Sequence, residues 1–324
     1  MPHVALGPGR EFDRVRAVQA ALGPAAAGLG DDCAVLPPAA LAGAALVVST
    51  DASVEDVHFR RGWLTLEEVG WRAAAAALSD LAAEGAEPLG LVAAVAVPAG
   101  AEDAALTELM RGVGAAAAAV GTRVLGGDLT AGPVWAVAVT VFGRAERPVT
   151  RAGARPGDGL WVTGALGGAR AALEALEAGT APAPAARERF ARPAPRIAAG
   201  RWLAAHGATA MLDLSDGLGG DVRHLAAASG VRLAVALEQA PVAADAVAPA
   251  RAADVPVQRW VAEGGEDYEL LVTLPPTFGA AEARAFEAAT GLALTRIGAV
   301  ERGAGVDVRL AGRPLALRGF DHFG

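Results

Sequence analysis

Apolar runs of strand length alternate with helical patterns along this chain, and this alternation most restricts the folds open to it. Apolar runs at 44–50 and 89–97 are each followed by a helical pattern. The helix after the first run is expected to begin with the capping pair Thr65 and Glu68 and to end near residue 83. A further strand is expected at 134–142. The pattern predicts an α/β or α+β protein.

Residues 144–159 interrupt the alternation with RAERPVTRAGARPGDG, a run rich in arginine, proline and glycine. Strands and helices resume beyond it, with a strand expected at 160–163 and helices at 218–229 and 280–290. A chain of 324 residues is long enough to bury two cores. We therefore expect an N-terminal domain over 1–147 and a C-terminal α/β domain over 148–324.

Composition excludes several classes of protein. The net charge is −8 and basic residues never cluster beyond pairs, so no nucleic-acid partner is expected. No stretch approaches about 18 uninterrupted apolar residues, so no membrane span is expected. The N-terminal residues lack the pattern of a signal peptide, and the single cysteine, Cys33, cannot form an internal disulfide. These features together favour the cytoplasm.

All 28 basic residues are arginine, because the chain contains no lysine. This excludes a P-loop lysine, the strand lysine of protein kinases and a Schiff-base lysine. If the protein handles phosphate groups, arginine side chains, backbone amides or metal ions must neutralise them.

Aspartates stand at the ends of elements beside small residues. Asp51 ends the 44–50 strand, Asp128 follows a short strand and two glycines, and Asp213 and Asp216 lie in DLSDGLGGD. Each alone could be an N-cap or a turn residue, and Asp216 or Asp221 could simply start the following helix. Converging carboxylates would raise each other's pKa, whereas a hard cation such as Mg²⁺ favours their ionised form. The pattern therefore points to metal-assisted phosphoryl transfer.

The chain also resembles the thiamine-monophosphate kinase family, in the superfamily of aminoimidazole ribonucleotide synthetase and selenophosphate synthetase. Ten collinear segments carry this resemblance: GREFDRV at 9–15, GDDCAVL at 30–36, STD at 49–51 with VHF at 57–59, LSDLAAEGAEP at 78–88, GGDLTAGP at 126–133, TRAGARPGD at 150–158, RPAPR at 192–196, DLSDG at 213–217, GGEDYEL at 264–270 and GFDHF at 319–323. They span nearly the whole sequence, so the resemblance is far more specific than any one motif.

The resemblance implies ATP- and Mg²⁺-dependent phosphorylation of thiamine monophosphate to thiamine diphosphate, without a covalent enzyme intermediate. It also implies a homodimer in which the N-terminal sheet pairs with that of a second subunit into a barrel. The nucleotide is expected in the cleft near the N-terminal domain.

Carried over by position, the resemblance assigns a role to each matching residue. The expected metal ligands are Asp32, Ser49, Thr50, Asp51, Asp80, Asp128, Asp213 and Asp216. Expected nucleotide contacts are Gly127, Asp128, Arg151 and Ser215. Expected contacts to thiamine monophosphate are His58, Glu266 and Phe320. Of these residues, Asp51, Asp213 and Asp216 are expected to act in catalysis.

Some positions depart from the family pattern. Ala77 replaces an asparagine, Leu129 replaces a threonine, and Glu55 and Asp56 precede VHF where the family often has Glu-Gly. The aspartates are all retained. Two alternatives stay open: another ATP-using enzyme of the superfamily, or a nucleotide- or metal-binding sensor without catalysis.

Overall fold

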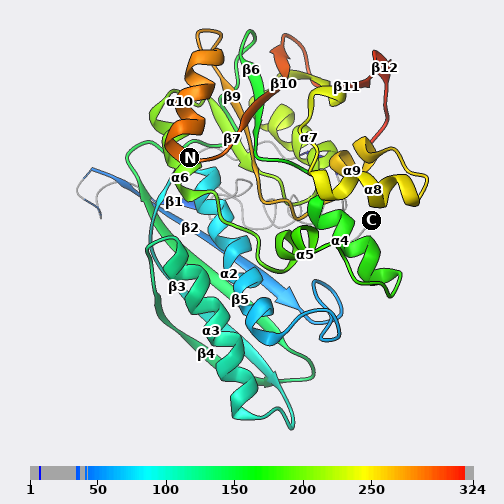
Figure 1. The fold of residues 1–324 in the computed structure, drawn as a ribbon. Helices are drawn as coiled ribbons and strands as arrows, with labels where there is room; N and C mark the ends of the chain where they lie inside the picture. The colour runs from blue at the N-terminus through cyan, green and yellow to red at the C-terminus, as the bar shows by residue number, and fades with distance from the viewer. Residues whose placement is uncertain (1–6, 9–33, 37–40, 42, 318–324) are drawn as a thin grey trace.

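The computed structural model describes residues 7–8, 34–36, 41 and 43–317. Three residues of the sequence analysis, Asp32, Cys33 and Phe320, lie outside this part of the chain. The described residues form two mixed sheets with helices packed against them (Figure 1). The fold is therefore a mixed α/β architecture in two parts, as the alternation predicted.

The first sheet has five strands in the order β1-β2-β5-β3-β4. Only β3 and β4 run parallel, and the other neighbours are antiparallel. The strands are β1 (Ala34–Leu36), β2 (Ala45–Val54), β3 (Glu87–Pro98), β4 (Val124–Gly132) and β5 (Ala136–Ala145).

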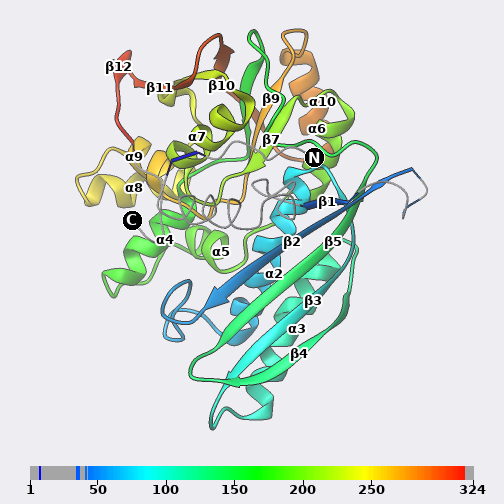
Figure 2. The ribbon, with the colours of Figure 1, turned by 180° about the vertical axis from the view of Figure 1, so that it is seen from behind.

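Helices α2 (Leu66–Ala83) and α3 (Asp103–Ala119) cover one face of this sheet. Valines of β2 and β5 alternate toward them, so Val47, Val139 and Val141 are fully buried. The capping box predicted for Thr65 and Glu68 is present at the start of α2. Among the described residues no helix covers the opposite face, which Figure 2 shows in front.

The second sheet has seven strands in the order β12-β11-β8-β10-β6-β9-β7. Its strands are β6 (Gly159–Thr163), β7 (Ala210–Asp213), β8 (Arg232–Ala236), β9 (Leu270–Leu274), β10 (Leu294–Glu301), β11 (Gly305–Leu310) and β12 (Arg313–Pro314). The surrounding helices are α4 (Gly168–Glu177), α5 (Pro184–Ala191), α6 (Ile197–Ala205), α7 (Leu218–Ser229), the 3₁₀ turn η3 (Leu237–Gln239), α8 (Ala244–Ala252), α9 (Val257–Glu263) and α10 (Ala280–Thr290). Helix α7 packs beside β7, β8 and β11.

Helix α2 joins the two sheets, because it contacts β2 and β5 of the first and also β7 and α6 of the second part (Figure 1). The approach of α6 is close: a Cβ added at Gly200 would lie 1.9 Å from the Ala82 carbonyl oxygen. At the end of α2 the Val149 amide donates to the Glu84 carbonyl over 3.1 Å. The expected domain boundary at 147/148 falls between the two sheets and stays a prediction.

The short strand expected to end before Gly126, Gly127 and Asp128 instead runs through them, because all three lie inside β4. Parallel pairing with β3 continues through them to Gly132. A Cβ at Gly127 would lie 1.9 Å from the Ala93 carbonyl oxygen, so the glycines serve a close approach of two strands. By contrast, the helices expected at 218–229 and 280–290 are confirmed as α7 and α10.

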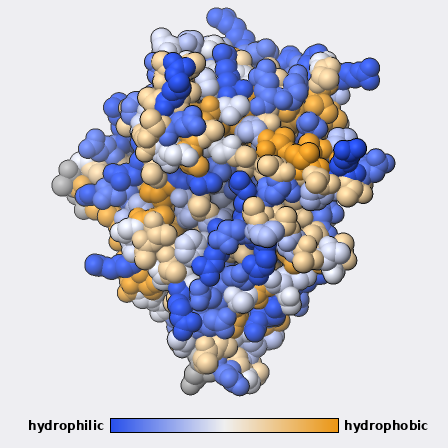
Figure 3. All heavy atoms as spheres, viewed as in Figure 1, coloured by the Kyte–Doolittle hydropathy of each residue, from blue (hydrophilic) through white to orange (hydrophobic). Residues whose placement is uncertain are grey.

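In the part of the chain that the structure describes, every helix is too short or too polar to cross a membrane. The side of the molecule seen in Figure 3 carries polar side chains interspersed with small apolar patches. Nothing on this face resembles a continuous apolar belt.

Helices α2 and α3 touch through glycine, which yields a first prediction. A Cβ at Gly112 would lie 1.8 Å from the Glu67 carbonyl oxygen, whereas a Cβ at Gly114 would meet nothing within 4 Å. We expect Gly112→Ala to lower the free energy of unfolding by about 1–3 kcal/mol, because the helices must separate. Gly114→Ala should instead raise it by up to about 1 kcal/mol. Denaturant unfolding of both variants tests this, and equal effects would contradict the close approach.

Candidate active site

Three carboxylates from different elements converge where the two sheets meet. Asp51 lies on β2, Asp80 on α2 and Asp213 at the end of β7. Burial, followed by the charges of Asp51 and Asp213, raises the pKa of Asp80 well above its ordinary value. The Ser49 hydroxyl donates to Asp80 Oδ2 over 2.5 Å and partly offsets that shift. The structure thus brings together four of the residues expected to bind metal.

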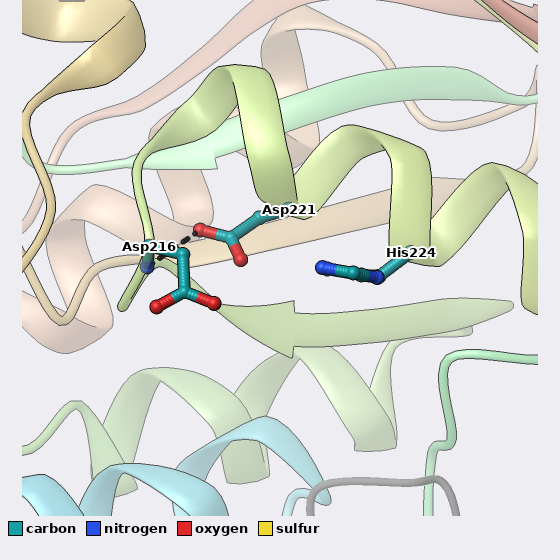
Figure 4. Close-up of side chains that lie close together, drawn as sticks. All are labelled: Asp216, Asp221 and His224. Atoms are coloured by element: carbon teal, nitrogen blue, oxygen red, sulfur yellow. Dashed lines mark hydrogen bonds between the residues drawn. The ribbon is translucent and has the colours of Figure 1, made fainter. Parts of the chain in front are cut away.

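A second group lies where the DLSDG loop enters α7. Gly217, with φ of 91°, is the N-cap of the helix, a role the sequence analysis left open to Asp216 and Asp221. Instead, Asp221 Oδ2 accepts the Asp216 amide over 3.3 Å. Figure 4 shows Asp216, Asp221 and His224 facing one another, with one potential ligand atom from each within 4.8 Å of the others.

The charged side chains of these two groups interact with one another. Burial, then Asp216 and Asp213, raises the pKa of Asp221 well above its ordinary value. Arg151 lies close enough to oppose the burial-driven rise in the pKa of Asp213 and the rise at Asp221. Burial lowers the pKa of His224 to about 4, with Arg151 and then Arg223 adding to the effect. The imidazole is therefore neutral at physiological pH, and Arg151 supplies positive charge to this region.

The segment GGEDYEL holds the DLSDG loop in place from the opposite side. Its Glu266 and Tyr268 amides donate to the carbonyl oxygens of Ser215 and Leu214 over 2.8 and 2.9 Å. Both residues have left-handed backbones, with φ of 68° and 49°. A Cβ at Gly265 would lie 2.4 Å from the Ser215 carbonyl oxygen, so this position requires glycine. Strained backbone at a convergence of carboxylates is typical of a functional site.

Glu266 is tied to the N-terminal part by an ion pair that the sequence analysis did not anticipate. Arg72 of α2, only 4% exposed, donates to the Glu266 carboxylate and to the Phe190 carbonyl. Its guanidinium lies 4.2 Å from the centre of the Phe190 ring. Burial and Glu266 raise the pKa of Tyr268 well above its ordinary value, and Asp51 and Asp213 contribute further. Tyr268 therefore lies beside the carboxylates.

Thr50 and Asp128 are not brought to this cluster within one chain. Asp128 pairs with Ala94 of β3, Ala94 pairs with Ala138 of β5, and Ala138 pairs with Ala52 of β2. Asp128 therefore shares the open face with Thr50, whose hydroxyl accepts from Thr140 over 3.0 Å. Three strand spacings, together about 14 Å, separate β4 from β2. Gly127, next to Asp128 in β4, pairs with Ala93 and lies as many strands from β2 as Asp128 does.

His58 lies in the turn after β2, where its Nδ1 accepts the Val54 amide over 3.1 Å. Asp32 and Phe320 lie outside the described residues, so their expected roles stay predictions. The sequence analysis missed His224 and weighed Asp221 only as a helix-start residue. The sequence did contain a signal for this group. Asp221 and His224 are three residues apart, so they share one face of the expected helix, and Asp221 follows Asp216 by five residues.

Fold and site together define a two-part enzyme scaffold with an acidic centre between its sheets. Residues 30–145 match the N-terminal domain family of AIR synthase related proteins, and residues 155–311 match the corresponding C-terminal domain family. The match identifies the broad class of the protein.

Individual relatives are more specific. The chain is 40% identical to thiamine-monophosphate kinase of Halobacterium salinarum over 90% of this chain and 94% of the relative. It is 36% identical to that of Caulobacter vibrioides over 96% of this chain and 90% of the relative. The solved structure of AaThiL complexed with AMPPCP and TMP is 31% identical, with a TM-score of 0.86 over 97% of both chains. The chain belongs to the thiamine-monophosphate kinase family.

The raised pKa of Asp80 yields a second prediction. Its folded-state pKa exceeds the unfolded value near 3.8, so the unfolded chain loses the proton first as pH rises. Asp80 therefore does not lower the free energy of unfolding at low pH, but it lowers this free energy increasingly as pH rises above about that value. In EDTA, Asp80→Asn should be more stable than the wild type at pH 7, and the difference should vanish near pH 4.

Denaturant unfolding across this pH range measures the effect. Asp307→Asn is the matched control, because Arg309 lowers the pKa of partly buried Asp307 and no stabilisation at pH 7 is expected there. A difference between wild type and Asp80→Asn that is independent of pH would contradict the electrostatic origin.

Proposed function

We propose that this chain transfers the γ-phosphoryl group of ATP to the phosphate of thiamine monophosphate, giving thiamine diphosphate and ADP. A phosphate oxygen of the acceptor forms the new P–O bond as the bond to ADP breaks. The relatives' activity and the AaThiL complex with AMPPCP and TMP support this reaction. The observation that carries it is the meeting of Asp51 and Asp80 with Asp213, from opposite sheets.

The donor set suits Mg²⁺, which prefers oxygen ligands. Burial and mutual repulsion disfavour ionised carboxylates here, and a divalent cation reverses that preference. We assign the cations to Ser49, Asp51, Asp80, Asp213 and Asp216, with Asp32 expected to join them. When bound, the metal ions neutralise charge on the transferring phosphoryl group.

The residues of the chain position the nucleotide around these carboxylates. Arg151 is near Asp213 and Asp221, where a guanidinium suits bidentate contact with phosphate oxygens. Ser215 precedes α7, and the amides of a helix N-terminus favour anions. We assign ATP contacts to both residues.

We assign the acceptor to the side of the cluster near Glu266 and His58, with Phe320 expected to complete it. Glu266 shares its carboxylate with Arg72, so the pair as a whole is close to neutral. It would therefore orient the thiazolium ring more than attract it. The Tyr268 ring beside this pair supplies an aromatic surface.

We further propose that two copies pair through the open face of the first sheet into a barrel. Its side chains are apolar and partly exposed at Val48, Val92 and Phe142, with Leu125 52% exposed at the edge. The face also carries Thr50 and Asp128, so a second subunit offers these residues a way to reach an active site. An ATP-using biosynthetic reaction suits the cytoplasm.

The kinase proposal predicts thiamine diphosphate on incubation with ATP, Mg²⁺ and thiamine monophosphate, detected by chromatography. EDTA should abolish it, and Asp216→Asn should lower the rate at least about a hundredfold because a cation ligand is lost. The matched control Asp254→Asn changes an exposed aspartate beyond α8 and should leave the rate unchanged. ATP binding without product from wild type would favour the sensor alternative and overturn the kinase.

The dimer proposal predicts that Leu125→Asp yields monomers in sedimentation or light scattering, because a charge enters an apolar interface. Val247→Asp is the control: Val247 is 48% exposed on α8, away from the open face. A wild type that is monomeric at micromolar concentration would refute the pairing, as would an unchanged dimer in Leu125→Asp.

A further inference from the structure

The group at the start of α7 contains a side chain that the oxygen-only metal set does not use. His224 is 8% exposed and Asp221 4% exposed, whereas Asp216 is only half-buried. Figure 4 shows one ring nitrogen of His224 turned toward the two carboxylates. One potential ligand atom of each residue lies within 4.8 Å of the others.

Local structure fixes these three side chains before any ligand arrives. Asp221 and His224 stand three residues apart on the same face of α7. Gly217, with φ of 91°, turns the chain so that Asp216 faces that helix. The Asp216 amide binds one oxygen of Asp221 and leaves the other directed to the group. Such preorganisation is what a metal site requires of its ligands.

We propose that Asp216, Asp221 and His224 form a divalent-cation site of mixed oxygen and nitrogen ligands that favours Mn²⁺ over Mg²⁺. Nitrogen ligands raise affinity for transition metals, whereas Mg²⁺ selects oxygen. The site differs in chemistry from the oxygen set of Ser49, Asp51 and Asp80. It deepens the proposed function, because Asp216 belongs to both.

The group of three side chains contains more charge than an Asp–His pair that only stabilises the fold would need. Such a pair requires two groups, whereas here a third carboxylate, Asp216, adds negative charge that acts on buried Asp221, as does Asp213. Arg151 opposes this charge only in part. A cation would bind all three ligands at once, and half-buried Asp216 leaves the group accessible from the DLSDG loop.

Electron paramagnetic resonance of Mn²⁺ tests the site directly. Tag-free protein without nucleotide should show electron spin echo modulation from a directly bound imidazole nitrogen. His224→Gln should lose this modulation, and His206→Gln should keep it, because His206 is exposed and stacks on Trp202 3.6 Å away. Wild-type protein whose bound Mn²⁺ lacks nitrogen modulation would overturn the proposal, as would modulation that survives in His224→Gln.

Metal selectivity provides the second readout. His224→Gln should weaken Mn²⁺ binding at least about tenfold and Mg²⁺ binding much less, so the affinity ratio falls. If the histidine is only structural, the variant loses thermal stability while the ratio stays constant, which also refutes the site. Neither readout uses turnover, so nitrogen ligation without kinase activity would refute the kinase alone, and the reverse result would refute only this site.

Discussion

Repulsion between buried carboxylates is the constraint on which the rest of this structure depends. Asp51 and Asp80 are held on one side and Asp213 on the other, and the charges of Asp51 and Asp213 make Asp80 harder to ionise. A folded protein keeps such charges close together only where many surrounding contacts hold them in place. Here that support comes from α2, which packs against both sheets, and from the ion pair of buried Arg72 with half-buried Glu266. Separating Glu266 from Arg72 would leave the buried Arg72 charge uncompensated, so the pair holds the two parts of the chain together.

The alanine-rich sequence of α2 follows from its position. This helix touches the first sheet, α3, α6 and β7, so it has almost no solvent face. Small residues let backbones approach on every side, as at Gly70 against α3 and at Ala82 against Gly200. Larger side chains would move Asp80 away from Asp213. Composition that carries little functional information by itself therefore sets the spacing of the acidic centre.

Sequence patterns predicted those features that depend on local chemistry. The capping box of α2 and the bounds of α7 and α10 follow from neighbouring residues. The fate of Asp128 does not, because a register shift beside Val92 decides how β4 pairs with β3 and so which face Asp128 occupies. The Arg72–Glu266 pair joins residues 194 positions apart, and only tertiary packing can select it. The family resemblance, rather than local chemistry, predicted that Asp51, Asp80 and Asp213 belong to one set, since the same pattern also selected Asp128, which lies apart from them.

The DLSDG loop is rigid because neighbours hold it from two sides. Amides of the GGEDYEL segment bind Ser215 and Leu214, while the Asp221 carboxylate binds the Asp216 amide. Hydrogen bonds thereby offset the left-handed backbone at Glu266 and Tyr268. In the proposed metal site, one half of the ligand set is fixed to this loop and the other to β2 and α2, so a bound cation would connect the two sheets. Its binding free energy adds to the interface between them, so substrate phosphate that strengthens cation binding also favours the assembled site. The proposed cation site would thus couple the arrangement of the two sheets to catalysis through the same few carboxylates.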